Sequence, residues 1–147
     1  MILDTSTDVM EIIDLTSFTV EVSATSNAGF INVGGFYQAI DADGTVINPV
    51  TGEEVSVGDE GYEEAALANS VVQIGDGEDA TLELDAGFAY VPYLLANGIR
   101  FFTAYEEANP DGIDHVQSVS ENTFGFEDLL GGGDNDFNDY VISFDII

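Results

Sequence analysis

Residues 124–147 read FGFEDLLGGGDNDFNDYVISFDII, an acidic, glycine-rich loop between two apolar segments. The loop carries five carboxyl groups and two asparagine amides. Carboxylates this close repel one another, and each raises the pKa of its neighbours unless a positive charge lies nearby. The chain contains a single arginine, a single histidine and no lysine. A bound metal ion is therefore the simplest counter-charge.

The candidate ligands of this ion are all oxygen atoms. They belong to Glu127, Asp128, Asp134, Asp136, Asn138 and Asp139, with Asn135 in a supporting, hydrogen-bonding position. Such a hard set suits calcium and suits zinc or copper poorly. The alternative is that the Asp and Asn side chains cap main-chain groups of a glycine-rich hairpin, without a metal.

The spacing of Asp134, Asp136 and Asn138 is similar to the first three ligand positions of an EF-hand loop. The likeness ends there, because Asp139 occupies the position that requires glycine. Residues 140–147 also predict a strand, whereas an EF-hand needs a helix on each side of its loop. We therefore exclude an EF-hand and retain a metal-binding loop.

A second polar loop contains Asp111, Asp114 and His115. We expect the two aspartates to join the metal ligands if both loops meet at one end of the fold. Histidine is an unusual calcium ligand, so His115 is expected to act through hydrogen bonds around the site. The alternative is a plain turn at residues 109–112, capped by the Asp and His side chains.

The clearest strand signal lies at residues 18–25. Apolar Phe18, Val20, Val22 and Ala24 alternate there with polar residues, which is typical of a half-buried strand. Residues 62–69 predict a helix of about two turns. Further strands are expected at residues 30–40, 71–74, 80–84, 87–96, 99–105, 116–119, 124–126 and 140–146. About nine short strands indicate an all-β fold, an antiparallel sandwich or jelly roll, with residues 1–17 as a linker or first strand.

Several residues within these strands carry specific expectations. Pro92 cannot donate a ladder hydrogen bond, so its strand is expected at an edge or with a bulge. The pair Gly34–Gly35 predicts a kink or bulge. Tyr93, Tyr105 and Tyr140 are candidates to stack on a ligand, with packing in the core as the alternative that we favour.

Composition limits the possible partners. The chain has 147 residues, 45% of them hydrophobic, which is enough for one domain with its own core. The net charge of −28 leaves no basic patch, which excludes nucleic-acid binding and disfavours anionic membranes. Such a charge opposes compaction unless divalent cations or high salt neutralise it, so salt adaptation is an alternative explanation. The absence of cysteine excludes disulfides and zinc-thiolate sites.

The run GFEDL at residues 125–129, followed by GGGDNDFNDYV at residues 131–141, resembles the signature of the bacterial domain of unknown function 4114. Weaker landmarks at residues 27–30, 41–46, 95–98 and 111–115 follow the order of that family, so the resemblance covers about residue 27 to the end. It implies a β-rich module of large secreted or surface-attached bacterial proteins, often adhesins. It also implies calcium binding and ligand recognition, without a settled biochemical activity.

From the residues and the resemblance together, we expect a non-catalytic, calcium-binding extracellular domain over residues 1–147, excised from a larger secreted protein. Its ligand would be a glycan or another surface molecule, with no insertion into a membrane. The alternative is a structural spacer that calcium makes rigid and that has no ligand of its own. A glycoside-active enzyme is disfavoured, because the carboxylates cluster in turns with Gly and Asn rather than forming a separated acid and base.

Overall fold

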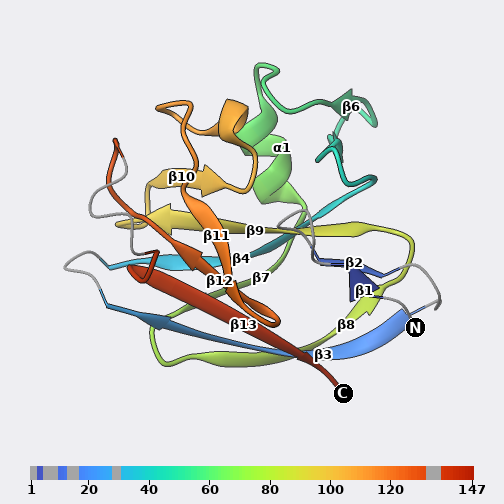
Figure 1. Ribbon diagram of the computed structural model, residues 1–147. Coiled ribbons are helices and arrows are strands. Elements are labelled where there is room, and N and C mark those ends of the chain that lie inside the picture. The colour runs from blue at the N-terminus through green and yellow to red at the C-terminus, as the bar shows by residue number, and fades with distance from the viewer. Residues whose placement is uncertain (1–2, 5–9, 13–16, 28–30, 132–136) are drawn as a thin grey trace.

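The computed structural model describes residues 3–4, 10–12, 17–27, 31–131 and 137–147. Two antiparallel sheets face each other, with β4 (Val33–Ala39) and β9 (Ala89–Ala96) in the upper layer of Figure 1 and β3 (Ser17–Ser26) and β13 (Tyr140–Ile146) in the lower layer. The predicted all-β sandwich is therefore confirmed. Within the described chain, no helix combines the length and the apolar character needed to cross a membrane.

Within the described residues the first sheet has six strands, and β9 pairs with three of them. Its order is β1 (Leu3–Asp4), β2 (Met10–Ile12), β9 (Ala89–Ala96), β4 (Val33–Ala39) and β7 (Ser70–Gly75), and β10 (Arg100–Thr103) also pairs with β9. The segment before residue 17 thus contributes strand backbone, because β2 pairs with β9. The described residues of this segment therefore agree with the first-strand interpretation.

The second sheet, counted over the part of the chain that the structure describes, has five strands and forms the other layer. Its order is β11 (Val116–Ser120), β12 (Thr123–Phe126), β13 (Tyr140–Ile146), β3 (Ser17–Ser26) and β8 (Asp79–Asp85). In β3 the side chains alternate between buried and exposed from Phe18 to Thr25, as predicted. The alternation arises because one face of this sheet packs on the core and the other meets solvent.

Strands β4 and β9 are buried on both faces, so they lack this alternation. Their inner face packs against the second sheet, where Phe36 contacts Phe124 and Phe144 edge-on. Helix α1 (Tyr62–Ala68) covers the outer face, as Figure 1 shows. The short strands β5 (Val46–Ile47) and β6 (Glu54–Val55) and the 3₁₀ helix η1 (Glu106–Ala108) lie in the connections.

The expectation that the strand with Pro92 lies at an edge or carries a bulge is wrong, because β9 has neighbours on both sides and its pairing with β4 shows no register shift. Strand β9 is interior: it pairs with β4 from Ala89 to Leu95 and with β2 and β10 on its other side. The pairing with β2 reaches Tyr90 and the pairing with β10 begins at Tyr93. Among the described residues, Pro92 therefore lies between these two partners, a position that accommodates a residue without an N–H group.

The bulge expected at Gly34–Gly35 lies one residue further on. The pairing of β4 with β7 shifts register between Phe36 and Tyr37. At Gly35 the lack of a side chain instead allows two strands to approach closely, because a Cβ there would lie 1.7 Å from the carbonyl oxygen of Val72. Gly35 thus lets the backbones of β4 and β7 come together at a point where no side chain fits.

Candidate functional site

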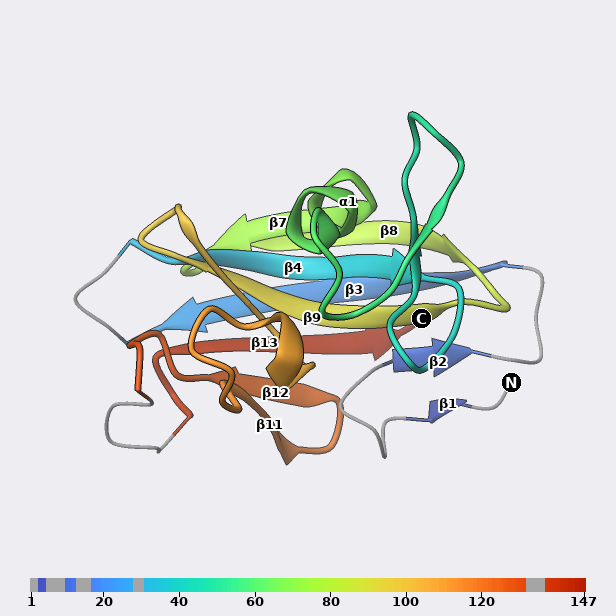
Figure 2. The same ribbon diagram turned by 90° about the horizontal axis from the view of Figure 1, so that it is seen from above.

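Two polar loops meet at one end of the sandwich. One is the β12–β13 loop, which begins after Phe126, and the other precedes β11. The N–H of Glu127 donates to the carbonyl of His115 at 3.0 Å, and the N–H of Gly131 donates to Oδ2 of Asp111 at 2.9 Å. Figure 2 shows the two loops side by side. The prediction for Asp111 required the two loops to meet at one end of the fold, and they do.

His115 holds these loops together from inside. It is fully buried, and its ring stacks on Phe102 with centroids 3.8 Å apart. Its Nδ1 donates to the carbonyl of Glu127 at 2.9 Å, since a carbonyl can only accept, and its Nε2 lies 2.7 Å from Oδ2 of Asp111. Partial burial raises the pKa of Asp111, but hydrogen bonds from Gly131, His115 and Ile113 outweigh it and leave the pKa below its usual value.

Three carboxyl groups gather where the β12–β13 loop begins and ends. Glu127 and Asp128 are 0% and 3% exposed. The N–H of Phe137 donates to Oε1 of Glu127 at 2.7 Å, and the N–H of Asp128 donates to Oδ2 of Asp139 at 3.1 Å. Burial raises the pKa of Asp139, and the carboxylate of Asp128 adds to this, although the Asp128 N–H and Glu127 oppose it. Mutual repulsion of the kind expected from the sequence thus acts at this site.

Asn32 is a site residue that the sequence did not reveal. It is 3% exposed, its Nδ2 donates to Oδ2 of Asp128 at 2.9 Å, and its Oδ1 accepts the N–H of Asn97 at 3.0 Å. It therefore ties β4 and the β9–β10 turn to the acidic loop. Nothing near Asn32 in the chain signals this role, because Asp128 lies 96 residues away.

The remaining predicted residues do not all join this cluster. Asp114 is exposed, and its Oδ1 accepts the N–H of Val116 at 3.1 Å, as in the plain-turn alternative. Asn138 is exposed beside Asp139. Asp134, Asn135 and Asp136 lie outside the described residues. Among the residues that are described, no group of three or more His, Asp or Glu side chains is arranged to hold a metal ion.

Comparison with known families identifies the chain. Residues 68–146 match the family described as "Domain of unknown function (DUF4114)". The chain belongs to this family. The matched range runs from the end of α1 through β13 and includes both polar loops, whereas the weaker landmarks at residues 27–30 and 41–46 lie outside it. Searches of the curated proteins and of the solved structures each found no match.

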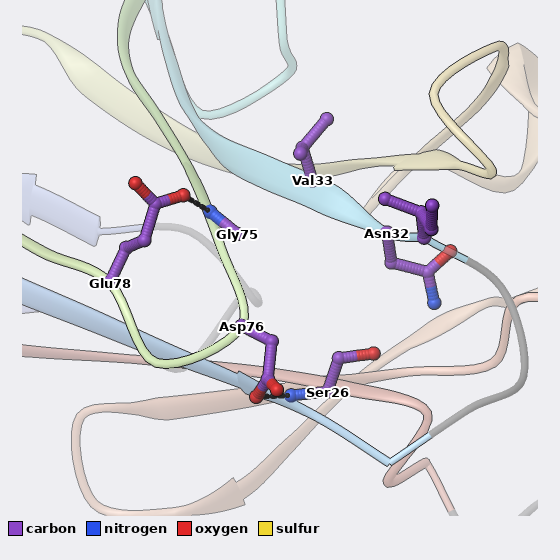
Figure 3. Close-up of a pocket in the computed structure, with 7 residues that line it drawn as sticks. Ser26, Asn32, Val33, Gly75, Asp76 and Glu78 are labelled. Atoms are coloured by element: carbon purple, nitrogen blue, oxygen red, sulfur yellow. Dashed lines mark hydrogen bonds between the residues drawn. The ribbon is translucent and has the colours of Figure 1, made fainter.

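A pocket of about 390 Å³ adjoins the acidic loop of this DUF4114 domain. Asn32 and Ser26 line it and also contact the loop, since the Ser26 hydroxyl donates to the carbonyl of Asp139 at 2.8 Å. On its other side, Asp76 accepts the N–H of Ser26 and Glu78 accepts the N–H of Gly75, as Figure 3 shows. The pocket therefore presents hydrogen-bond acceptors and no basic side chain among its lining residues.

The tyrosines proposed as stacking platforms lie elsewhere in the DUF4114 domain. Tyr93 and Tyr140 are fully buried in the two core clusters, which confirms the packing alternative. Tyr105 is partly buried, and its hydroxyl donates to the carbonyl of Ala42 at 2.8 Å. Exposed apolar side chains are found at the loop end instead: Ile31 is 80% and Ile99 is 76% exposed.

Proposed function

We propose that this chain is a non-catalytic, calcium-binding extracellular module, with the ion held in the β12–β13 loop. The observation that carries the proposal is the convergence of the Glu127, Asp128 and Asp139 carboxyl groups, two of them buried, in a chain with one arginine and no lysine. Burying carboxylates together is unfavourable without a compensating positive charge. Calcium supplies that charge when bound.

The donor set supports calcium over other metals. Every side-chain donor in the loop is a carboxylate or amide oxygen, and calcium takes six to eight such ligands where zinc prefers nitrogen and sulfur. The described carboxylates alone are too few, so we propose that Asp134 and Asp136 complete the ligands. They lie in sequence between Gly131 and Phe137, both of which are anchored by hydrogen bonds to site residues.

We further propose that the loop end binds a ligand, a glycan or another surface molecule, in a calcium-dependent manner. The pocket beside Asn32 supports this, because its carboxylates can accept hydrogen bonds from hydroxyl groups. The exposed Ile31 and Ile99 flank the same end and add apolar contact area. Calcium would hold the loop in one conformation, and Asn32 would transmit that order to the pocket wall.

The calcium proposal is tested by thermal unfolding of metal-stripped protein. A ligand that binds only the folded state raises the melting temperature. We expect about 1 mM calcium to raise it by several degrees, and equimolar magnesium to raise it much less, because magnesium demands a tighter octahedral shell. Asp139→Asn should reduce the calcium response, whereas Asp145→Asn, which removes the same charge from the exposed sheet face, should preserve it.

An unchanged melting temperature in calcium would contradict the metal site. Ligand recognition is tested separately with a glycan array probed in calcium and in chelator. Hits that disappear in chelator support recognition. If calcium stabilises the protein but the array gives no such hits, the chain is a calcium-rigidified spacer.

A further inference from the structure

Strand β8 forms an open edge of the second sheet. Among the described residues it pairs only with β3, and the pairing runs without a register shift from Ser17 opposite Asp85 to Ser23 opposite Asp79. Figure 2 shows β8 along one side of the molecule and β11 along the opposite side. Seven residues without a bulge are enough to template a further strand.

The hydrogen-bonding pattern shows which groups this edge offers. The N–H of Ala24 donates to the carbonyl of Glu78, which fixes Glu78 as a residue whose main chain faces β3. From Glu78 onward, alternate residues direct their N–H and C=O groups toward β3 and away from it. Residues 80, 82 and 84 direct their main-chain groups to β3, and residues 79, 81, 83 and 85 direct theirs outward. The carbonyl of Asp85 already accepts the Tyr90 hydroxyl. Among the described residues, the outward N–H and C=O groups of Thr81 and Glu83 therefore belong to an open ladder.

The side chains of the edge are of two kinds. On the solvent face Asp79, Thr81, Glu83 and Asp85 are all exposed, and Glu21 of β3 lies opposite Thr81. On the inner face Ala80 and Leu82 pack against the core but are only partly buried. A strand added at this edge would cover the two apolar side chains and lie beside a row of carboxylates.

We propose that β8 is the docking edge for an extended, basic segment of another protein, which pairs with Thr81 and Glu83 as an additional strand. Lysine or arginine at alternate positions would face Asp79, Glu83 and Asp85, and apolar residues between them would cover Leu82. A second copy of this chain does not fit. It has no lysine, and β8 against β8 would oppose like charges, which destabilises a sheet.

The acidic side chains of β8 all point to the solvent face, so they exclude an acidic strand without blocking a basic one. The β11 edge offers fewer free main-chain groups. The Asp114 side chain caps the outward N–H of Val116, and a register shift interrupts the pairing of β11 with β12. The proposed docking uses neither calcium nor the carboxylates of the β12–β13 loop. A negative result for calcium binding would therefore leave the proposed docking unaffected, and the reverse also holds.

The test uses a capped peptide of alternating lysine and valine, compared with a peptide of the same composition whose lysines form one block. Both carry the same charge, so general attraction to an acidic protein is equal for the two. We expect the alternating peptide to bind at least about tenfold more tightly, about 1.4 kcal/mol, because only in that peptide does one paired register place every lysine beside the carboxylates and every valine over Ala80 and Leu82. Hydrogen exchange should slow at the Thr81 and Glu83 amides on binding.

Two variants complete the experiment. Thr81→Pro removes an outward N–H without changing charge, a substitution that an edge strand tolerates, and should weaken the alternating peptide about tenfold. Glu83→Lys keeps the backbone intact, should weaken the lysine peptide and should create affinity for an alternating glutamate and valine peptide. Equal binding of alternating and block peptides, unchanged exchange at Thr81 and Glu83, or full affinity in both variants would each overturn the proposal.

Discussion

At the scale of single residues, the site depends on a position without a side chain. A Cβ on Gly125 of β12 would lie 2.0 Å from the carbonyl oxygen of Phe137 and 3.0 Å from Cγ1 of Val119. The glycine thus lets the end of the β12–β13 loop lie flat on the strand that begins it. This contact brings the Phe137 N–H within reach of Glu127 and fixes one side of the acidic cluster.

Replacing Gly125 by alanine should therefore separate the loop from β12. We expect the free energy of unfolding to fall by about 2 to 3 kcal/mol, because the backbone must move to relieve the overlap. Urea unfolding measures this change. Gly87→Ala is the control: Gly87 has a φ of 87° but nothing within 4 Å of an added Cβ, so only the cost of the backbone conformation, about 1 kcal/mol, should appear. Equal losses in both variants would contradict the steric account.

At the scale of elements, helix α1 is attached to the first sheet by buried hydroxyl groups as well as by apolar contacts. The Tyr62 hydroxyl donates to the carbonyl of Gly44 at 2.6 Å and lies 2.8 Å from the Tyr37 hydroxyl, which in turn lies 2.7 Å from Oγ1 of Thr103. Burial raises the pKa of Tyr62 to about 12. The hydroxyls therefore stay protonated and join α1, β4 and β10 in one network.

Tyr62→Phe should cost about 1 to 2 kcal/mol in the free energy of unfolding, because it leaves the Gly44 carbonyl and the Tyr37 hydroxyl short of a buried partner. Hydrogen exchange should also quicken in α1 relative to the second sheet. Tyr105→Phe makes the same chemical change at a partly buried tyrosine, whose hydroxyl donates to the carbonyl of Ala42, and should cost less. A Tyr62→Phe protein as stable as the parent would show that apolar packing alone holds α1.

At the scale of the whole molecule, the net charge of −28 makes stability depend on pH and on cations. The pKa of Asp139 is raised in the folded state, so its stabilising contribution is complete below its usual pKa of about 4 and is lost as the pH rises through the folded value. The contribution of Asp111 to stability depends on pH in the opposite direction: its pKa is lowered in the folded state, so the contribution is lost only on acidification.

Metal-stripped protein should consequently lose stability as the pH rises from about 4 to 7, and calcium should abolish the loss. Asp139→Asn should make this loss of unfolding free energy smaller, by less than about 1 kcal/mol, because the Asp139 carboxyl is partly solvated. Urea unfolding at a series of pH values, with and without calcium, measures both effects. Molar sodium chloride should reduce the pH dependence of both proteins alike by screening. Stability that rises with pH in the absence of calcium would contradict this view.

The sequence by itself determined the kinds of element and the chemistry of the loop. Alternation at Phe18 to Thr25 predicted β3, and the oxygen-rich residues after Phe126 predicted a hard-cation site, because periodicity and side-chain type are local properties. Only the tertiary structure decided that Asp111 contacts Gly131, that Asn32 supports Asp128, and that the strand with Pro92 is interior. These contacts join residues far apart in the chain, so they follow from how two sheets pack and which loops that packing brings to one end.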